Sequence, residues 1–187
     1  MPVRRFILTA VVVGAMTGFA VAGFERLAVS VLFERVVSHA PLVLLACIPG
    51  VGLALTTWWL RSRQVSPATA DEYLDAFHAG RALTLRDLVV RVVGGVLTLG
   101  SGCALGLEGP SIYVGSAIGS TAQRRFRALM SGADRNTLLV AGAAAGIAAI
   151  FKAPATGAVF ALEVPYHDDL ARRMLLPALV GAASGYL

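Results

Sequence analysis

Charged residues are scarce in this sequence of 187 residues, since Asp, Glu, Lys and Arg make up 14% of it and hydrophobic residues 57%. The mean hydropathy is correspondingly high, at +0.74. A soluble domain of this size usually carries about 25% charged residues. The composition therefore excludes an ordinary soluble domain and indicates that lipid is the main solvent of this chain.

Residues that carry enzyme or metal chemistry are also few. The two cysteines, Cys47 and Cys103, lie in apolar segments at no metal-ligand or redox spacing. His39, His78 and His167 share no metal-ligand spacing either. No nucleophile triad, phosphate loop or nucleotide fingerprint occurs, so we expect no enzyme activity, no metal and no cofactor. The net charge of +5 comes with no basic face interleaved with aromatic residues, which argues against a nucleic-acid partner.

Long uncharged runs are what the sequence has instead. Residues 6–24 carry no charge, and residues 36–60 carry only the titratable His39, so each run can cross a hydrocarbon core about 30 Å thick. Five shorter apolar stretches read as partial crossings: 92–107, 109–123, 136–151, 153–162 and 174–187. No stretch alternates apolar and polar residues in the manner of transmembrane strands. We predict an all-α integral membrane protein with tilted and broken helices.

Arginines beside the two long runs predict the topology. Arg4 and Arg5 precede the first run, and Arg61 and Arg63 follow the second. By the positive-inside tendency both flanks are cytoplasmic, the N-terminus included, and residues 34–41 lie outside the cell membrane. A cleaved leader ending near residues 20–22 is an alternative, although 19 apolar residues are long for one.

Residues 61–87 form the one extended polar connection. Ser66 and Pro67 there read as the N-cap and first residue of a short helix, with acidic residues following in its first turns. Glycines also recur at four-residue spacing, which lets helix backbones approach closely in a bilayer. These pairs are Gly14/Gly18, Gly102/Gly106, Gly115/Gly119, Gly142/Gly146 and Gly181/Gly185. Residues 136–151 have almost no large side chain in their middle, so other helices must surround them.

Glu108 is a lone carboxylate between two uncharged segments. An acidic residue at mid-membrane costs roughly 2.5–3.5 kcal/mol on insertion scales, so such residues usually face a water-filled cavity and have a function. Gly106 and Gly109 permit close approach of a ligand to the backbone, and Pro110 favours the first turn of a helix. The free N–H groups of that helix start form an anion site. Glu108 then reads as a gate that competes with the anion; a surface loop is the alternative.

The segment 106–110, Gly-Leu-Glu-Gly-Pro, resembles the G-(K/R)-E-G-P signature of CLC chloride channels and transporters. Residues 88–119 and 137–164 are similar to the helix pairs that follow one another in that family. The resemblance implies that residues 1–187 form the first of two inverted repeats, and hence a truncated N-terminal half of the family's transmembrane domain. It also implies Glu108 as gate, the turn of Gly106, Leu107, Gly109 and Pro110 as part of the anion site, chloride or a similar anion as substrate, and a homodimer.

Two departures from the family pattern bear on function. Where the family has a serine loop, this chain has Ser-Pro-Ala-Thr-Ala at 66–70, so Ser66 or Thr69 substitutes or no hydroxyl contributes. Where proton-coupled members carry a glutamate after the one matching Glu163, this chain has Val164. Val164 favours channel-like passage of the anion. The alternatives are a proton-coupled chloride antiporter and a non-conducting fragment or assembly subunit, since a second half with its own anion contacts is not encoded here. Arg91 and Lys152, in apolar surroundings, are expected to snorkel or to face an aqueous vestibule.

Overall fold

The computed structural model describes residues 3–126, 136–166 and 172–186, and His167 and Arg127 lie outside these ranges. Within them the chain is helical, without strands, which confirms the all-α prediction. The elements are α1 (Val3–Glu25), the π-helix η1 (Arg26–Phe33), the 3-10 turn η2 (Val37–His39), α2 (Leu42–Arg63), α3 (Ala70–Ala79), α4 (Leu85–Gly100), α5 (Glu108–Arg125), α6 (Thr137–Phe151), α7 (Pro154–Glu163), the 3-10 turn η4 (Arg172–Met174) and α8 (Leu175–Tyr186).

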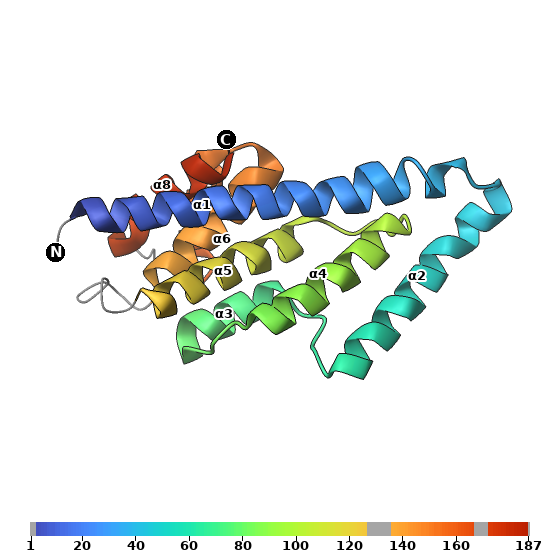
Figure 1. Ribbon diagram of the computed structural model, residues 1–187, viewed down its shortest axis with the longest axis horizontal. Coiled ribbons are helices and arrows are strands. Elements are labelled where there is room, and N and C mark those ends of the chain that lie inside the picture. The colour runs from blue at the N-terminus through green and yellow to red at the C-terminus, as the bar shows by residue number, and fades with distance from the viewer. Residues whose placement is uncertain (1–2, 127–135, 167–171, 187) are drawn as a thin grey trace.

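The first two α-helices are the longest that the structure describes, with 23 residues in α1 and 22 in α2. In Figure 1, α1 and η1 form one long rod, and α2 turns back from its far end. The stretch Ile7–His39 and the helix Leu42–Arg63 are both long and apolar enough to cross a membrane. At a rise of about 1.5 Å per residue, the 22 residues of α2 extend about 33 Å, enough for the hydrocarbon core. Two membrane crossings were predicted from residues 6–24 and 36–60, and these helices occupy the same places.

The first uncharged run ends at residue 24, but the helix that contains it extends further. The helix continues through Glu25 and Arg26 to Phe33, now with π-helical bonding. Charges marked the end of the apolar run, but they do not interrupt backbone hydrogen bonding. Ala28, in the continuation, is fully buried, and its carbonyl oxygen lies against Gly100 of α4. Packing against α4 therefore extends the rod beyond the apolar stretch.

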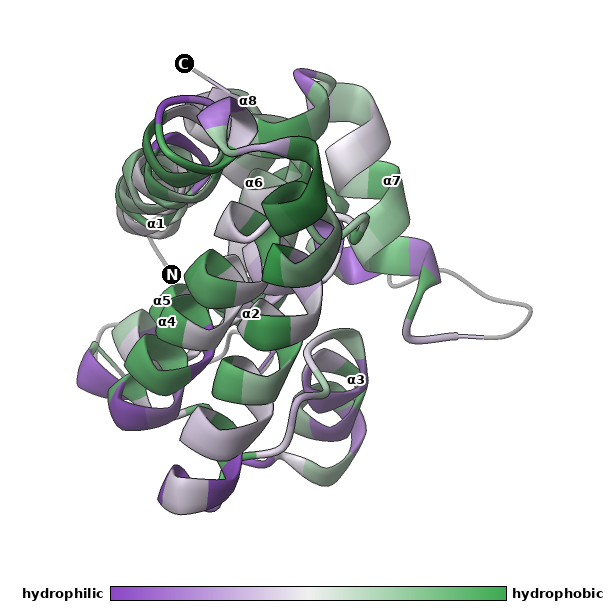
Figure 2. Cartoon of the chain, turned by 90° about the vertical axis from the view of Figure 1, so that its right-hand side faces the viewer, coloured by the Kyte–Doolittle hydropathy of each residue, from purple (hydrophilic) through white to green (hydrophobic). Residues whose placement is uncertain are grey.

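The surface of α2 is apolar and open. Leu42 and Val43 are 83% and 77% exposed, and Trp58 is 66% exposed. Figure 2 shows hydrophobic colour along the middle of α2 and hydrophilic colour at its Arg61 and Arg63 end. Such a surface suits lipid, because a soluble protein rarely leaves so many adjacent apolar side chains in water.

Helix α6 lies at the centre of the bundle, against α1, α5, α7 and α8. Every residue from Thr137 to Ala149 is buried. The prediction that residues 136–151 are surrounded by helices is confirmed. Small side chains explain the position, because only a slim helix allows four neighbours to reach its backbone.

Most of the glycine pairs lie at these helix crossings. A Cβ on Gly142 would collide with the carbonyl oxygen of Gly115, and one on Gly119 with that of Leu138, so α5 and α6 touch backbone to backbone. Gly14 and Gly18 of α1 likewise lie against Gly181 and Gly185 of α8. The pair Gly102/Gly106 is the exception and was misread. It lies between α4 and α5, with Gly102 at φ +89°, where it forms a turn.

The short helix of the polar connection begins later than predicted. Its N-cap is Thr69, and Asp71 and Glu72 lie in the first turn of α3. The hydroxyl of Ser66 instead accepts a hydrogen bond from the amide of Ala68, at 3.1 Å, and so closes a local turn. The acidic first turn was right, whereas the start at Ser66 and Pro67 was three residues early.

Candidate anion site

The start of α5 follows from the residues around it. After α4 ends, Gly102 turns the chain, and residues 103–106 lead without helix to Leu107, the N-cap. No side chain caps this helix, and its first intrahelical bond runs from the amide of Ser111 to the carbonyl of Leu107, at 3.1 Å. The amides of Glu108 and Gly109 therefore precede the hydrogen-bonded turns, and Pro110 has no N–H. A helix beginning at this signature was the sequence prediction, and α5 begins there.

Glu108 is the first residue of α5, and its carboxylate folds back toward the preceding turn. A Cβ on Gly106 would collide with Oε2 of Glu108 and would lie 3.2 Å from Oε1. The carboxylate thus covers the Cα of Gly106, a position that only glycine leaves free. Glu108 is partly buried, and it borders a cavity.

That cavity, about 490 Å³ in volume, lies between α2, the connection before α3, α4 and the first turn of α5. Apolar side chains form most of its wall. The polar groups on it come from four segments of the chain and are Thr56, Thr57, Thr69, Arg91, Thr98 and Glu108. Gly106, Gly109 and Pro110 complete the wall at the α5 end.

The two hydroxyl residues that the sequence singled out are placed differently. Thr69 lines the cavity, and its Oγ1 lies where a Cβ on Gly109 would be. Ser66 is exposed, is outside the cavity wall, and uses its hydroxyl on Ala68. The cavity therefore brings together Thr69, Gly106, Glu108, Gly109 and Pro110. Leu107 is the N-cap of α5, and neither Leu107 nor Ser66 is part of the cavity wall.

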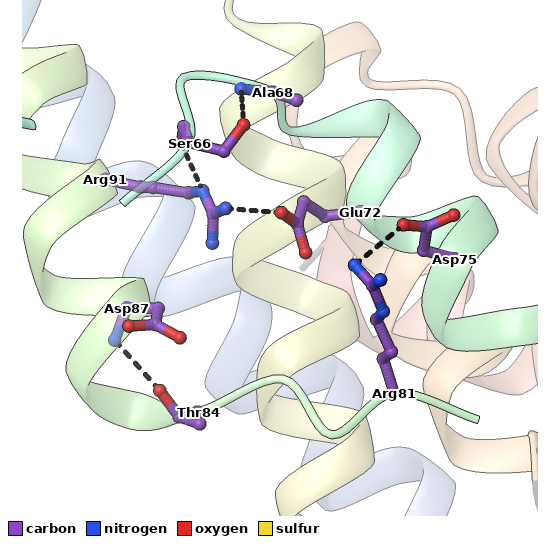
Figure 3. A network of polar contacts seen from close by, with 8 residues as sticks. All are labelled: Ser66, Ala68, Glu72, Asp75, Arg81, Thr84, Asp87 and Arg91. Carbon is purple, nitrogen blue, oxygen red and sulfur yellow. Dashed lines mark hydrogen bonds and ion pairs between the residues drawn. The ribbon is translucent and has the colours of Figure 1, made fainter. Parts of the chain in front are cut away.

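Arg91 is a cavity residue whose setting differs from the sequence prediction. Its side chain is 7% exposed, and Nη2 donates to Oε1 of Glu72 at 2.8 Å (Figure 3). Of the two alternatives predicted for Arg91, snorkelling was wrong, because the partly buried carboxylate of Glu72 compensates its charge inside the protein, whereas the side chain does border the cavity. In the sequence, Arg91 was recognisable as a single charge in an apolar run. Its partner Glu72, on another helix, could not be recognised.

Two threonines of the cavity carried no signal in the sequence. Thr98 donates to the carbonyl of Gly94 at 2.9 Å, and Thr56 Oγ1 lies 2.9 Å from Thr98 Oγ1. The first bond lies within α4, and the contact between the two hydroxyls joins α2 to α4. Lys152 lies elsewhere: it ends α6 in a left-handed conformation, is exposed, and borders a second cavity of about 390 Å³ beside α1 and α8.

The fold and this site define a class of protein, namely helical membrane proteins in which the uncapped start of a helix lies at the wall of a cavity. The family model described as "Voltage gated chloride channel" matches residues 54–187, and the chain belongs to this family. The matched region holds the polar connection, every residue of the cavity wall except Leu53, and all later helices.

Curated relatives agree with this membership. Proteins named H(+)/Cl(-) exchange transporter ClcA, from Citrobacter koseri and Salmonella arizonae, are both 36% identical, over 170 and 171 residues. Each alignment covers 84% of this chain and 35% of the relative. The chain thus spans about a third of the length of these relatives.

Solved structures confirm the fold. A crystal structure of a CLC-type fluoride/proton antiporter matches with a TM-score of 0.83 at 26% identity, covering 98% of this chain and 46% of that one. A slow cyanobacterial Cl-/H+ antiporter matches with a TM-score of 0.77 at 27% identity, covering 97% and 45%. The predicted CLC-like bundle of broken helices is confirmed.

Proposed function

We propose that this chain forms one of two inverted repeats of a proton-coupled anion exchanger in the cell membrane, with chloride or a similar small anion as substrate. The observation that carries the proposal is the carboxylate of Glu108 beside the uncapped start of α5, on the wall of a cavity. Positive helix ends attract anions, and a carboxylate at the same place competes with them. Protonation removes the charge of Glu108, so one group links anion entry to proton movement.

The names of the relatives support exchange over passive conduction. The channel-like reading of the sequence depended on Val164, which follows Glu163 at the end of α7. The relatives are named exchange transporters, and the solved structures are titled antiporters, one for fluoride and one for chloride. We therefore place the exchanger first. We also propose that the protein forms a homodimer and that its N-terminus is cytoplasmic.

The proposed anion contacts are the amides at Leu107, Glu108 and Gly109 and the hydroxyl of Thr69. Each lies at the first turn of α5 or directly against it. Ser66, the other candidate from the sequence, is not part of the proposed site.

Glu108→Gln tests the gate. Glutamine keeps the shape but has no titratable proton and no charge, so we expect chloride flux to persist or rise while chloride-driven proton movement falls by at least tenfold. Both fluxes are measured in vesicles carrying the purified protein under a chloride gradient. Glu34→Gln is the matched control, because Glu34 is exposed after η1 and outside the cavity.

Three outcomes separate the candidates. Uphill proton movement in the unmodified protein supports the exchanger, and chloride flux without it supports the channel-like reading. If neither ion moves, a non-conducting assembly subunit is the better description. Unchanged proton coupling in Glu108→Gln would contradict the gate assignment.

A further inference from the structure

Arg91 makes three contacts at once, and each goes to a different segment around the site. Nη2 pairs with Glu72 of α3 at 2.8 Å, Nε donates to the backbone carbonyl of Ser66 at 3.1 Å, and the guanidinium carbon lies 4.3 Å from the ring centroid of Tyr113 on α5. The side chain also borders the cavity. Figure 3 shows Arg91 reaching from α4 to the connection and to α3 together.

The connection that Arg91 contacts forms one wall of the cavity. Residues 64–69 join α2 to α3, and Pro67 and Thr69 among them line the cavity. A bond to the carbonyl of Ser66 therefore fixes this short loop from the side of α4. The hydroxyl of Ser66 also accepts a hydrogen bond from the amide of Ala68. The residue that Arg91 contacts is thus joined by a local turn to the residue just before Thr69.

Thr69 is the N-cap of α3, yet its side chain does not cap the helix. A threonine at this position commonly accepts a hydrogen bond from an amide in the first turn. Here its hydroxyl lies against Gly109 instead. Something other than capping must hold the loop in the arrangement that aims the hydroxyl at the start of α5.

The charge of Arg91 is already compensated. Glu72 is 22% exposed at its side chain and forms a salt bridge with Arg91, so the pair contributes little net charge to the cavity. Arg91 therefore acts by geometry more than by attraction of the anion. Lysine, with one ammonium group, cannot reproduce the fork that reaches Glu72 and Ser66 together.

We infer that Arg91 is a positioning residue, which holds the 64–69 connection so that the Thr69 hydroxyl faces the first turn of α5. The inference rests on the proposed function, since positioning matters only if an anion binds there. The geometric part is testable without any flux.

The rate of disulfide formation between positions 69 and 109 measures how closely residue 69 is held against the first turn of α5. An ideal Cβ on Gly109 lies 3.5 Å from Cβ of Thr69, within the range that a disulfide accepts. The test protein is Thr69→Cys/Gly109→Cys, with Cys47 and Cys103 replaced by serine. We expect Arg91→Lys to slow disulfide formation in detergent by roughly tenfold, as expected for the loss of one charge-assisted hydrogen bond. Arg86→Lys, at an exposed position of the same helix, should leave the rate unchanged.

A rate in Arg91→Lys equal to that of the parent overturns the inference. If Arg91→Lys does not fold, Arg91→Met/Glu72→Leu replaces it, because removing both partners leaves no lone buried charge. The same slowing is expected there, and an unchanged rate again overturns the inference.

A second measurement separates positioning from general loosening. Chloride affinity is compared by calorimetry in Arg91→Lys, Thr69→Val and the double variant, all with glycine at 109. If Arg91 acts through Thr69, the double variant binds no more weakly than Thr69→Val alone. Additive losses contradict this. If no variant or parent binds chloride, the proposed function fails, while the disulfide rates still decide the geometry.

Discussion

Glu108 and Thr69 lie 39 positions apart in the sequence, and the fold places both at the first turn of α5. The position of Glu108 at a helix start was predictable from the neighbouring glycines and proline. The choice between Ser66 and Thr69 was not, because both are hydroxyl residues of one loop. Only the local turn at Ser66–Ala68 and the approach of Thr69 to Gly109 distinguish them.

Thr69→Val should weaken chloride binding by about fivefold, since one hydrogen bond contributes about 1 kcal/mol. Valine keeps nearly the same shape, so the fold should persist. Ser66→Ala, three residues away, is the control and should change affinity by less than about twofold. Calorimetric titration of chloride into the detergent-solubilised protein measures both. A larger loss in Ser66→Ala than in Thr69→Val would exchange the two assignments.

At the scale of helices, the sequence predicted close packing but not which helices meet. Four-residue glycine spacing marked Gly115, Gly119 and Gly142, whereas the pairing of α5 with α6 depends on contacts between segments far apart in the chain. The π-helical continuation of α1 was missed for the same reason. The spacing of small residues shows which face of a helix can pack closely. Which other helix packs against that face depends on contacts between distant segments of the chain.

Gly142→Ala should destabilise the bundle, because the new methyl group collides with the carbonyl oxygen of Gly115. Overpacking of this kind costs about 1–3 kcal/mol, so we expect the thermal unfolding midpoint in detergent to fall by several degrees. Gly23→Ala in α1 is the matched control, since no atom lies within 4 Å of its added Cβ. There alanine should leave the midpoint unchanged or raise it slightly. Equal midpoints in both variants would mean that α5 and α6 are not in backbone contact.

For the whole molecule, the composition, the long uncharged runs and the lack of alternating strand patterns were enough to predict a helical membrane protein, and the exposed face of α2 agrees with this prediction. Leu42, Val43 and Trp58 are exposed although their side chains are large and hydrophobic. The predicted orientation across the membrane rests on the arginines that flank the two long apolar runs. The packing of the helices carries no information about this orientation.

The orientation can be read from two serines at opposite ends of α2. Ser38 lies exposed in η2 before the helix, and Ser62 lies exposed near its last turn, beside Arg61 and Arg63. Because basic residues stay on the cytoplasmic side, we expect Ser38→Cys to react with an impermeant maleimide in intact cells and Ser62→Cys to react only after permeabilisation. Both variants carry serine in place of Cys47 and Cys103, so labelling reports one position. The opposite labelling pattern would show that the chain has the inverted orientation. The start of α5 would then face an anion that approaches from the opposite side of the membrane.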